Sequence, residues 1–398
     1  MPPERLGAAL ALGALIFAAG CARSAGTEAP SVPAPLNDPA SAPAPSAAPA
    51  PADPAAAPTP PEAPEVPEPE EWLPPPVADR LARGTGEPAD AALAKGDSSY
   101  EADDWAGAER AYKTALRLAS RDPAPRVGLV RVALARSDVA RGYAAAPGDT
   151  RLKAWLEALD GALRLDADYG PALLERGRIL LMLGNAETAE AALRRAVALL
   201  PGHAEAESAL GVAFIARGDA ESAVRRFRRA SRLDPDNPER LTNLGTAYMM
   251  QGRVADAISV YERAVRLSPD DARALTDLGT AHLAQNRPDL GLPHLERAVE
   301  LEPKRATFMN NLGYAYQRTD QLERAIQTYR KALALDARLG SSWINLGTAL
   351  AQRGDYDEAK RAFEKARAID PSDPRVGANL EELEALRAGS SDGGSNSQ

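Results

Sequence analysis

Apolar residues recur at three- and four-residue spacing in paired runs between residues 170 and 373, and this spacing is typical of amphipathic helices. A glycine or a short polar residue separates the two runs of most pairs, as at Gly218 and Gly354. Such residues end one helix and cap the next. A proline such as Pro235 follows the second run in most pairs, and its ring cannot continue a helix. Each pair of runs therefore predicts a helical hairpin.

The hairpin pattern is repeated six times with a strict period of 34 residues. Glycine stands at the eighth position of each unit, at Gly177, Gly211, Gly245, Gly279, Gly313 and Gly347. Positions 20 and 27 are small and position 24 is large and apolar, as Ala359, Ala366 and Phe363 show in the last unit. Larger residues at the small positions would overpack the helix contact, at a cost of about 1–3 kcal/mol. One hairpin cannot bury its apolar face alone, so the units are predicted to stack into a solenoid.

This pattern resembles the tetratricopeptide repeat (TPR). The last unit carries the family's residues at Trp343, Leu346, Gly347, Leu350, Ala359, Phe363 and Pro371. The resemblance implies an all-α fold, a right-handed TPR α-solenoid of about eight helical hairpins plus a capping helix. It also implies a protein-binding scaffold, without naming the partner, because these repeats bind many unrelated proteins.

The flanks of the regular units extend the array. We expect a TPR-like unit at 89–122, an irregular unit with an insertion at 123–169, six regular units at 170–373, a capping helix at 374–388 and a disordered tail at 389–398. In the irregular unit the helices are expected at 126–141 and 151–165. In the fourth regular hairpin, between Ala272 and Arg305, Pro293 should kink or delay the second helix.

The N-terminus resembles a bacterial lipoprotein signal peptide over residues 1–20. An apolar run from Leu6 to Gly20 ends at Cys21, the single cysteine of the chain. The resemblance implies that Cys21 is lipidated, although Ala18 stands where the family usually has Leu. The alternative is an ordinary secretory signal that leaves a free thiol. Lipidation would place the protein in the bacterial cell envelope, and Ala22 favours the outer membrane facing the periplasm.

Residues 21–88 predict a lipid-anchored, disordered Ala/Pro-rich linker. Between Pro30 and Pro76 lie 18 of the chain's 34 prolines, and such a segment cannot bury enough apolar surface to fold. Residues 27–90 also hold 11 acidic and 2 basic residues, which accounts for the chain's formal net charge of −9. The repeat array is therefore nearly neutral, which argues against a nucleic-acid partner.

Catalytic chemistry has no candidate residues in this sequence. His203, His282 and His294 are too scattered for a metal site, and none has an evident nucleophile partner. We interpret them as satisfied or surface histidines and expect no cofactor, no metal and no enzyme activity. The arginines from Arg225 to Arg229 are expected to cover the outer face of the array, with Glu221 one turn before Arg225.

A row of mostly polar residues is expected on the concave wall, which the first helices build in this family. It comprises Thr242, Asn243, Thr246, Met249, Asp277, Thr280, Asn310, Asn311, Tyr314 and Asn345. The row resembles the asparagine ladder of the repeats in O-linked N-acetylglucosamine transferase, and the resemblance implies a groove for an extended peptide. An amide can donate to and accept from a peptide backbone at once. The alternative is that Asn at this position is only repeat consensus.

These features together predict a membrane-anchored scaffold that binds a protein or peptide partner. A narrower alternative is a pilotin-like assembly factor for a type IV pilus secretin. Another alternative is the regulatory subunit of a peptidoglycan enzyme.

Overall fold

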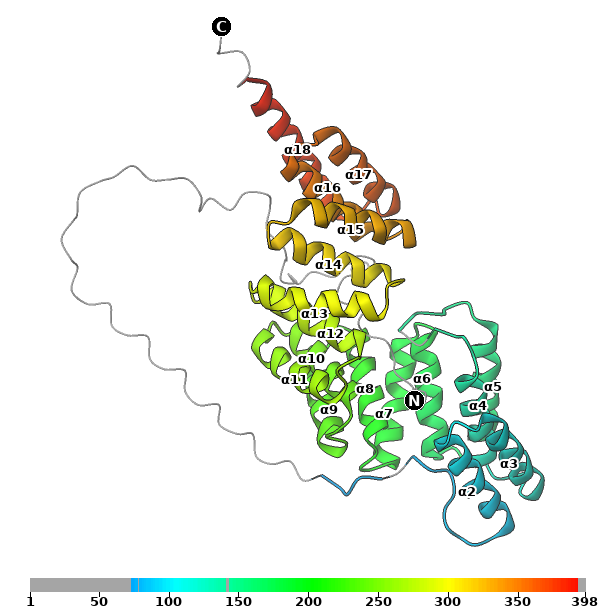
Figure 1. Cartoon of the computed structure of the whole chain (residues 1–398). Coiled ribbons are helices and arrows are strands. Elements are labelled where there is room, and N and C mark those ends of the chain that lie inside the picture. Colours follow the sequence, from blue (N-terminus) through cyan, green and yellow to red (C-terminus); the bar gives the residue numbers. More distant parts are fainter. Residues whose placement is uncertain (1–72, 78, 141–142, 393–398) are drawn as a thin grey trace, which may run out of the picture.

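The computed structural model describes residues 73–77, 79–140 and 143–392, with side chains up to Arg387. These residues form 17 helices, and no strand occurs in the described ranges. The helices are α2 Pro88–Glu101, α3 Trp105–Leu118, α4 Ala124–Ala135, α5 Thr150–Leu163, α6 Gly170–Met182, α7 Ala186–Leu199, α8 Ala204–Ala216, α9 Ala220–Leu233, α10 Pro238–Met250, α11 Val254–Leu267, α12 Ala272–Ala284, α13 Pro288–Leu301, α14 Ala306–Arg318, α15 Leu322–Leu335, α16 Gly340–Arg353, α17 Tyr356–Ile369 and α18 Pro374–Asp392. They form eight hairpins, stacked in chain order and followed by α18 (Figure 1), which confirms the predicted all-α solenoid.

A single left-handed residue makes the turn inside each regular hairpin. It has a φ of 80° at Gly218 and 92° at Gly354, a conformation that glycine adopts without steric cost. In two units the turn residue is Asn286 or Asp320, with φ of 59° and 60°. Asn and Asp tolerate this region better than other side chains do. The glycine or short polar residue between the two apolar runs therefore marks the hairpin turn, as expected.

The glycine at position 8 lies under the large side chain at position 24 of its own hairpin. A Cβ atom at Gly245 would lie 2.4 Å from Cε1 of Tyr261, and one at Gly347 would lie 2.6 Å from Cε1 of Phe363. Both distances are far shorter than a van der Waals contact, so any larger residue would push the two helices apart. Tyr261 and Phe363 are almost fully buried as a result.

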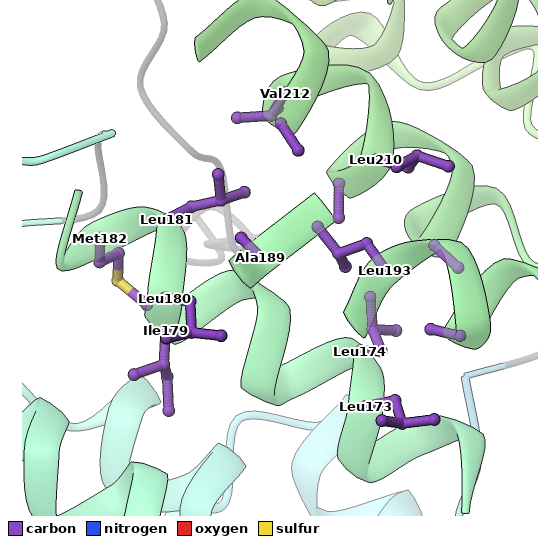
Figure 2. Close-up of a cluster of buried hydrophobic side chains, with 14 of the residues drawn as sticks. Leu173, Leu174, Ile179, Leu180, Leu181, Met182, Ala189, Leu193, Leu210 and Val212 are labelled. Carbon is purple, nitrogen blue, oxygen red and sulfur yellow. The ribbon is translucent and has the colours of Figure 1, made fainter. Parts of the chain in front are cut away.

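The core runs along the array between the two helix layers. Figure 2 shows one part of it, where Leu174 of α6, Leu193 of α7 and Leu210 of α8 converge. One continuous cluster extends from Leu81 to Ala281, and a second extends from Leu283 to Leu383. The boundary between these two clusters falls inside α12, in the hairpin that contains Pro293.

Pro293 lies inside α13, which begins at Pro288 and has the same 14 residues as the other regular second helices. The expectation that this proline delays the helix is therefore wrong. Pro288 occupies the first position of the helix, where its missing N–H removes no helical hydrogen bond. Pro293 still lacks the N–H that would bond one turn back.

The irregular second hairpin differs from its expected boundaries. Helix α4 ends at Ala135, six residues before the expected end at 141, because the inserted segment leaves the helix to pack on the end of α6. There the backbone N–H of Ala144 donates to the carbonyl of Leu181 at 2.9 Å, and that of Ala146 donates to Met182 at 3.1 Å. At the other end of the array, α18 continues to Asp392 and thus includes residues expected in the tail.

The expected disordered linker ends earlier than residue 88. Residues 79–87, here called the strap, lie against the first units, and Leu81 is only 2% exposed. Figure 1 shows this stretch in blue, leading into α2. A buried leucine and partners on the array hold it in place. Most of the linker, and the signal peptide with Cys21, lie outside the described residues.

Candidate peptide-binding wall

The predicted polar row lies on four consecutive first helices, α10, α12, α14 and α16. Thr242, Asn243, Thr246 and Asn310 are buried, and the other members are half-buried: Met249, Asp277, Thr280, Asn311, Tyr314 and Asn345. Side-chain hydrogen bonds join α12 to α14, through Asn311 and Thr280, and α14 to α16, through Asn345 and Asn310. The row follows these stacked first helices as one strip. We call this strip, from α10 to α16, the neutral half of the inner wall.

The amides of the strip bond mostly to each other and to hydroxyls. Nδ2 of Asn243 donates to Ser208 Oγ at 3.4 Å, and Nδ2 of Asn311 donates to Thr280 Oγ1 at 3.4 Å. Both distances are longer than the 2.7–3.2 Å usual for N–H···O bonds, so these contacts are weak. An amide side chain has two donor hydrogens and two acceptor lone pairs. Half-buried Asn311 therefore keeps capacity for a ligand, whereas Asn243 is only 4% exposed.

The threonine hydroxyls are turned toward their own helix. Thr242 Oγ1 donates to the carbonyl of Pro238 at 2.8 Å, and Thr246 Oγ1 donates to that of Thr242 at 3.0 Å. This bonding to the preceding turn uses the hydroxyl hydrogen, so these residues can offer a ligand only acceptor lone pairs. Their role in a peptide-binding wall stays a prediction, and the direction of their hydroxyls depends on the local helix geometry.

Asp277 holds the position that Asn243, Asn311 and Asn345 hold in their own units. Its Oδ2 atom is inaccessible to solvent and has no hydrogen-bond partner among the described residues. Burial raises the pKa of the Asp277 carboxyl to about 7, against the opposing effect of Arg273. A protonated carboxyl has one donor and one free acceptor, as an amide does. Near neutral pH, Asp277 can therefore continue the row of amides.

A second type of wall chemistry precedes the neutral half. Arg131 on α4 donates to Glu175 on α6 at 2.8 Å, and Arg178 bonds Glu175 in turn at 3.2 Å. Arg178 also lies 3.6 Å from Glu205 on α8, which Arg240 on α10 contacts at 3.2 Å. We call this chain of ion pairs the ionic half of the inner wall. Sequence reasoning missed it, although Glu175 and Arg178 occupy the same unit positions as Asn243 and Thr246.

The strap binds at the ionic half through its acidic side chain. Oδ1 of Asp79 lies 2.6 Å from Arg131 Nη2 and 3.2 Å from His203 Nε2. Burial raises the pKa of the Asp79 carboxyl, but Arg131 and His203 outweigh this effect and hold it well below its usual range. Asp79 is therefore ionised throughout the physiological pH range.

The strap backbone bonds to carboxylates of α2. The N–H groups of Leu81 and Ala82 both donate to Asp97 Oδ2 at 2.9 Å. Farther along, Asp90 accepts from the N–H groups of Arg83 and Thr85, both at 2.7 Å. Asp97 follows Gly96 as Thr246 follows Gly245, so it occupies an inner-wall position of the first unit. The strap is thus an extended segment held along this wall by polar side chains.

Comparison with known families identifies the repeat. Models described as Tetratricopeptide repeat match residues 156–204 and 208–272, 249–306, and 304–372. These matches follow one another along the regular hairpins and together cover more than half of the chain. The chain belongs to the tetratricopeptide repeat family. A comparison with curated proteins found no match.

Several solved structures are similar to this chain to different extents. The structure of the APC/C hetero-tetramer Cut9-Hcn1 matches with a TM-score of 0.58 at 16% identity, over 76% of this chain and 57% of that chain. This chain therefore spans little more than half of that relative's length. Pseudomonas aeruginosa pilF matches with a TM-score of 0.47 at 22% identity, over 55% of this chain and 98% of that one. MamA from Desulfovibrio magneticus RS-1 matches with a TM-score of 0.39 at 27% identity, over 43% of this chain and 97% of that one.

TPR proteins are generally non-catalytic scaffolds, and the fold of this chain supports a protein–protein interaction scaffold with protein or peptide partners. In the described parts of the chain, no group of histidine, cysteine and carboxylate side chains is arranged to hold a metal ion. The described helices also include none with the length and apolar character needed to cross a membrane.

The three histidines of the TPR array have different surroundings. The rings of His282 and His294 stack within one hairpin, with centroids 6.0 Å apart. Burial lowers the pKa of both rings, and each is therefore favoured in its neutral form. His203 is buried at the start of α8, where its ring also contacts Asp79 of the strap.

The arginines of α9 only partly cover an outer face. Arg225 pairs with Glu221, as expected. Arg226 and Arg229 instead pair with buried Glu207 of α8, both at 3.0 Å. The expectation that all these arginines are solvated is therefore wrong, because a buried carboxylate on the neighbouring helix draws two of them inward.

Proposed function

We propose that this TPR protein is a lipid-anchored scaffold of the bacterial cell envelope that binds an extended peptide segment along the neutral half of its inner wall. Cys21 carries the lipid, the array faces the periplasm from the outer membrane, and the protein has no catalytic activity of its own. Its partner supplies the chemistry, and the array supplies the binding surface.

The row of amides from α10 to α16 carries this proposal. Asn243, Asn311 and Asn345 recur at the unit spacing, and Asp277 continues the row as a neutral carboxyl. Such side chains bind backbone N–H and C=O groups, which a helical ligand would already use in its own hydrogen bonds. An extended segment leaves these groups available. The neutral half therefore suits an extended ligand better than a helical one.

The anchor is supported by the sequence around Cys21. The apolar run from Leu6 to Gly20 is too short for a spanning helix and has the length of a signal-peptide core. Acyl chains on Cys21 would hold the protein on a membrane, since each buried methylene contributes about 0.8 kcal/mol. The proline-rich linker would then let the array extend away from the lipid surface.

The experiment is a capture of partners from detergent-solubilised envelope with the full chain, followed by affinity measurement with the captured protein. Replacing Asn243, Asn311 and Asn345 together by Ala should weaken binding at least about tenfold, because each lost bond contributes about 0.5–1.5 kcal/mol. Helix content should stay unchanged. In the matched control, Ala likewise replaces Arg266 and Lys331, which are exposed on the second helices α11 and α15. Stronger loss in the control would move the binding site to the outer face.

The identity of the captured protein also separates the two narrower roles. A secretin would indicate a pilotin-like assembly factor, whereas a hydrolase or synthase would indicate the regulatory subunit of a peptidoglycan enzyme. Capture by the wild type and not by the triple-Ala variant would show that the partner uses the neutral half.

A further inference from the structure

We propose that the ionic half of the inner wall is a second peptide-binding site, specific for an extended segment with an aspartate two residues before a leucine, and that the strap occupies this site as a resident ligand. The proposal goes beyond the scaffold function described above. It concerns other helices, and its test needs no envelope partner, so either proposal can fail while the other stands.

The carboxylate pocket consists of Arg131 and His203. The side chain of Arg131 is only 4% exposed, and Glu175 and Asp79 are its two ion-pair partners among the described residues. Nδ1 of His203 accepts from the N–H of Ala206 at 3.2 Å, so Nε2 carries the hydrogen and donates to Asp79. The pocket thus presents one cation and one N–H donor, arranged to bind a single carboxylate.

The leucine pocket lies beside the first helix of the array. Leu81 belongs to the same core cluster as Leu93 of α2 and Tyr112 of α3. The hydroxyl of Tyr112 donates to Asp97 Oδ1 at 2.9 Å and so orients this carboxylate, whose other oxygen accepts from the strap backbone. Asp97 therefore fixes the register of the segment, with Leu81 entering the core while Asp79 reaches Arg131.

Several features mark the strap as a ligand of the wall. It contributes no helix, and its residues Arg80, Thr85 and Glu87 are exposed. The N–H groups of Leu81 and Ala82 donate to a wall carboxylate, and the Asp79 carboxylate accepts from Arg131. Such bonds are expected when a preformed groove holds an extended peptide. The strap enters α2 directly, so it competes with any free peptide at an effective concentration on the order of millimolar.

The test uses the full chain and a fluorescent peptide with the sequence of residues 79–87 as the probe. The Asp79→Ala/Leu81→Ala variant should bind this peptide at least about tenfold more tightly than the wild type, whose own strap blocks the site. The same peptide carrying the two alanine substitutions is the matched control and should not bind the variant. A milder variant, Asp79→Asn, should give an intermediate affinity with wild-type helix content.

Three results would overturn the proposal. Failure of the peptide to bind either variant, with helix content unchanged, would make the strap a fixed part of the fold. Equal affinity for wild type and double variant would place the peptide elsewhere. If the double variant loses helix content, amide exchange of Leu81 and Ala82 is measured in the wild type instead. We expect these two amides to exchange by a local opening of the strap. Exchange of these amides only through global unfolding would refute a releasable ligand.

Discussion

The side-chain amide of Asn345 donates to Oδ1 of Asn310 at 3.1 Å, and Ser342 Oγ donates to the same oxygen at 2.8 Å. Asn310 and Ser342 are buried, with 4% and 0% exposure. One oxygen on α14 thus collects two bonds from α16. Asn310 joins two neighbouring units, whereas its neighbour Asn311 is half-buried and bonds weakly. The two adjacent asparagines therefore have different roles.

Asn310→Ala should destabilise the array by about 1–3 kcal/mol, because it leaves the hydroxyl of buried Ser342 without its acceptor. Asn311→Ala should cost well under about 1 kcal/mol, since it removes only long hydrogen bonds. Urea unfolding followed by helix content measures both. A larger effect at Asn311 would contradict the assignment of Asn310 to structure and Asn311 to the ligand.

Asp277→Asn should stabilise the protein relative to the wild type, and more strongly at pH 8 than at pH 5. Burial raises the pKa of Asp277 from its ordinary value of 3.8 to about 7, so the folded state binds the proton more tightly than the unfolded state does. Its contribution to stability is complete below about pH 4 and is lost as the pH rises to about 7. Asn at this position has no proton to lose, so the variant does not undergo this loss of stability. Its free energy of unfolding at pH 8 should exceed that of the wild type by about 1–3 kcal/mol.

The difference between variant and wild type in urea midpoint should therefore grow from pH 5 to pH 8. A difference that is equal at both pH values would show that Asp277 is already ionised in the folded state. Peptide affinity of the wild type should fall over the same range, since an ionised Asp277 can no longer donate to a peptide carbonyl.

Amide exchange should be faster in residues 289–294 than in residues 323–328, which hold the same positions one unit later. Pro293 removes one helical hydrogen bond from α13, and the two large core clusters meet in the partner helix α12. Pro293→Ala should slow exchange in 289–294 and leave 323–328 unchanged. Equal protection of the two segments in the wild type would show that this hairpin is as stable as its neighbours.

Gly291→Ala should destabilise the array by about 1–3 kcal/mol, although Ala occupies this position in the other regular units. A Cβ atom at Gly291 would lie 2.6 Å from the backbone oxygen of Gly279, which cannot rotate away. The matched control is Gly377→Ala in α18, where an added Cβ atom would meet no neighbouring element of the described structure within 4 Å. The change there should be neutral or slightly stabilising. The thermal midpoints of both variants measure the difference, and a neutral Gly291→Ala would refute the close approach of α12 and α13.

Cys21→Ser should release the protein from the membrane fraction or leave it there with an uncleaved signal, because serine cannot carry the thioether-linked lipid. Fractionation with immunoblotting distinguishes the two outcomes from the wild type. A Ser24→Ala variant serves as the control and should remain in the membrane fraction. A mature-length Cys21→Ser protein that still sediments with membranes would refute lipid anchoring.

The sequence alone determined the repeat, because its physical cause is local. Gly218 must adopt a left-handed turn, and Gly245 must make room for Tyr261 only 16 residues later in the same hairpin. Both constraints recur at a fixed period, so the sequence predicted the helices, their turns and their stacking. The unit positions likewise placed Asn243, Asp277, Asn311 and Asn345 together on consecutive first helices.

Only the tertiary structure decided which of these side chains are already in use. The bonds of Asn310 to α16 and of Arg131 to Asp79 join residues 32 to 52 positions apart, and no local pattern encodes such pairs. The strap is the clearest case, since residues 79–87 were expected to belong to the disordered linker. It is ordered because Leu81 packs into the core and Asp79 pairs with the buried Arg131. Burial and charge pairing depend on what surrounds a residue in space, and the chain order of this strap does not contain that information.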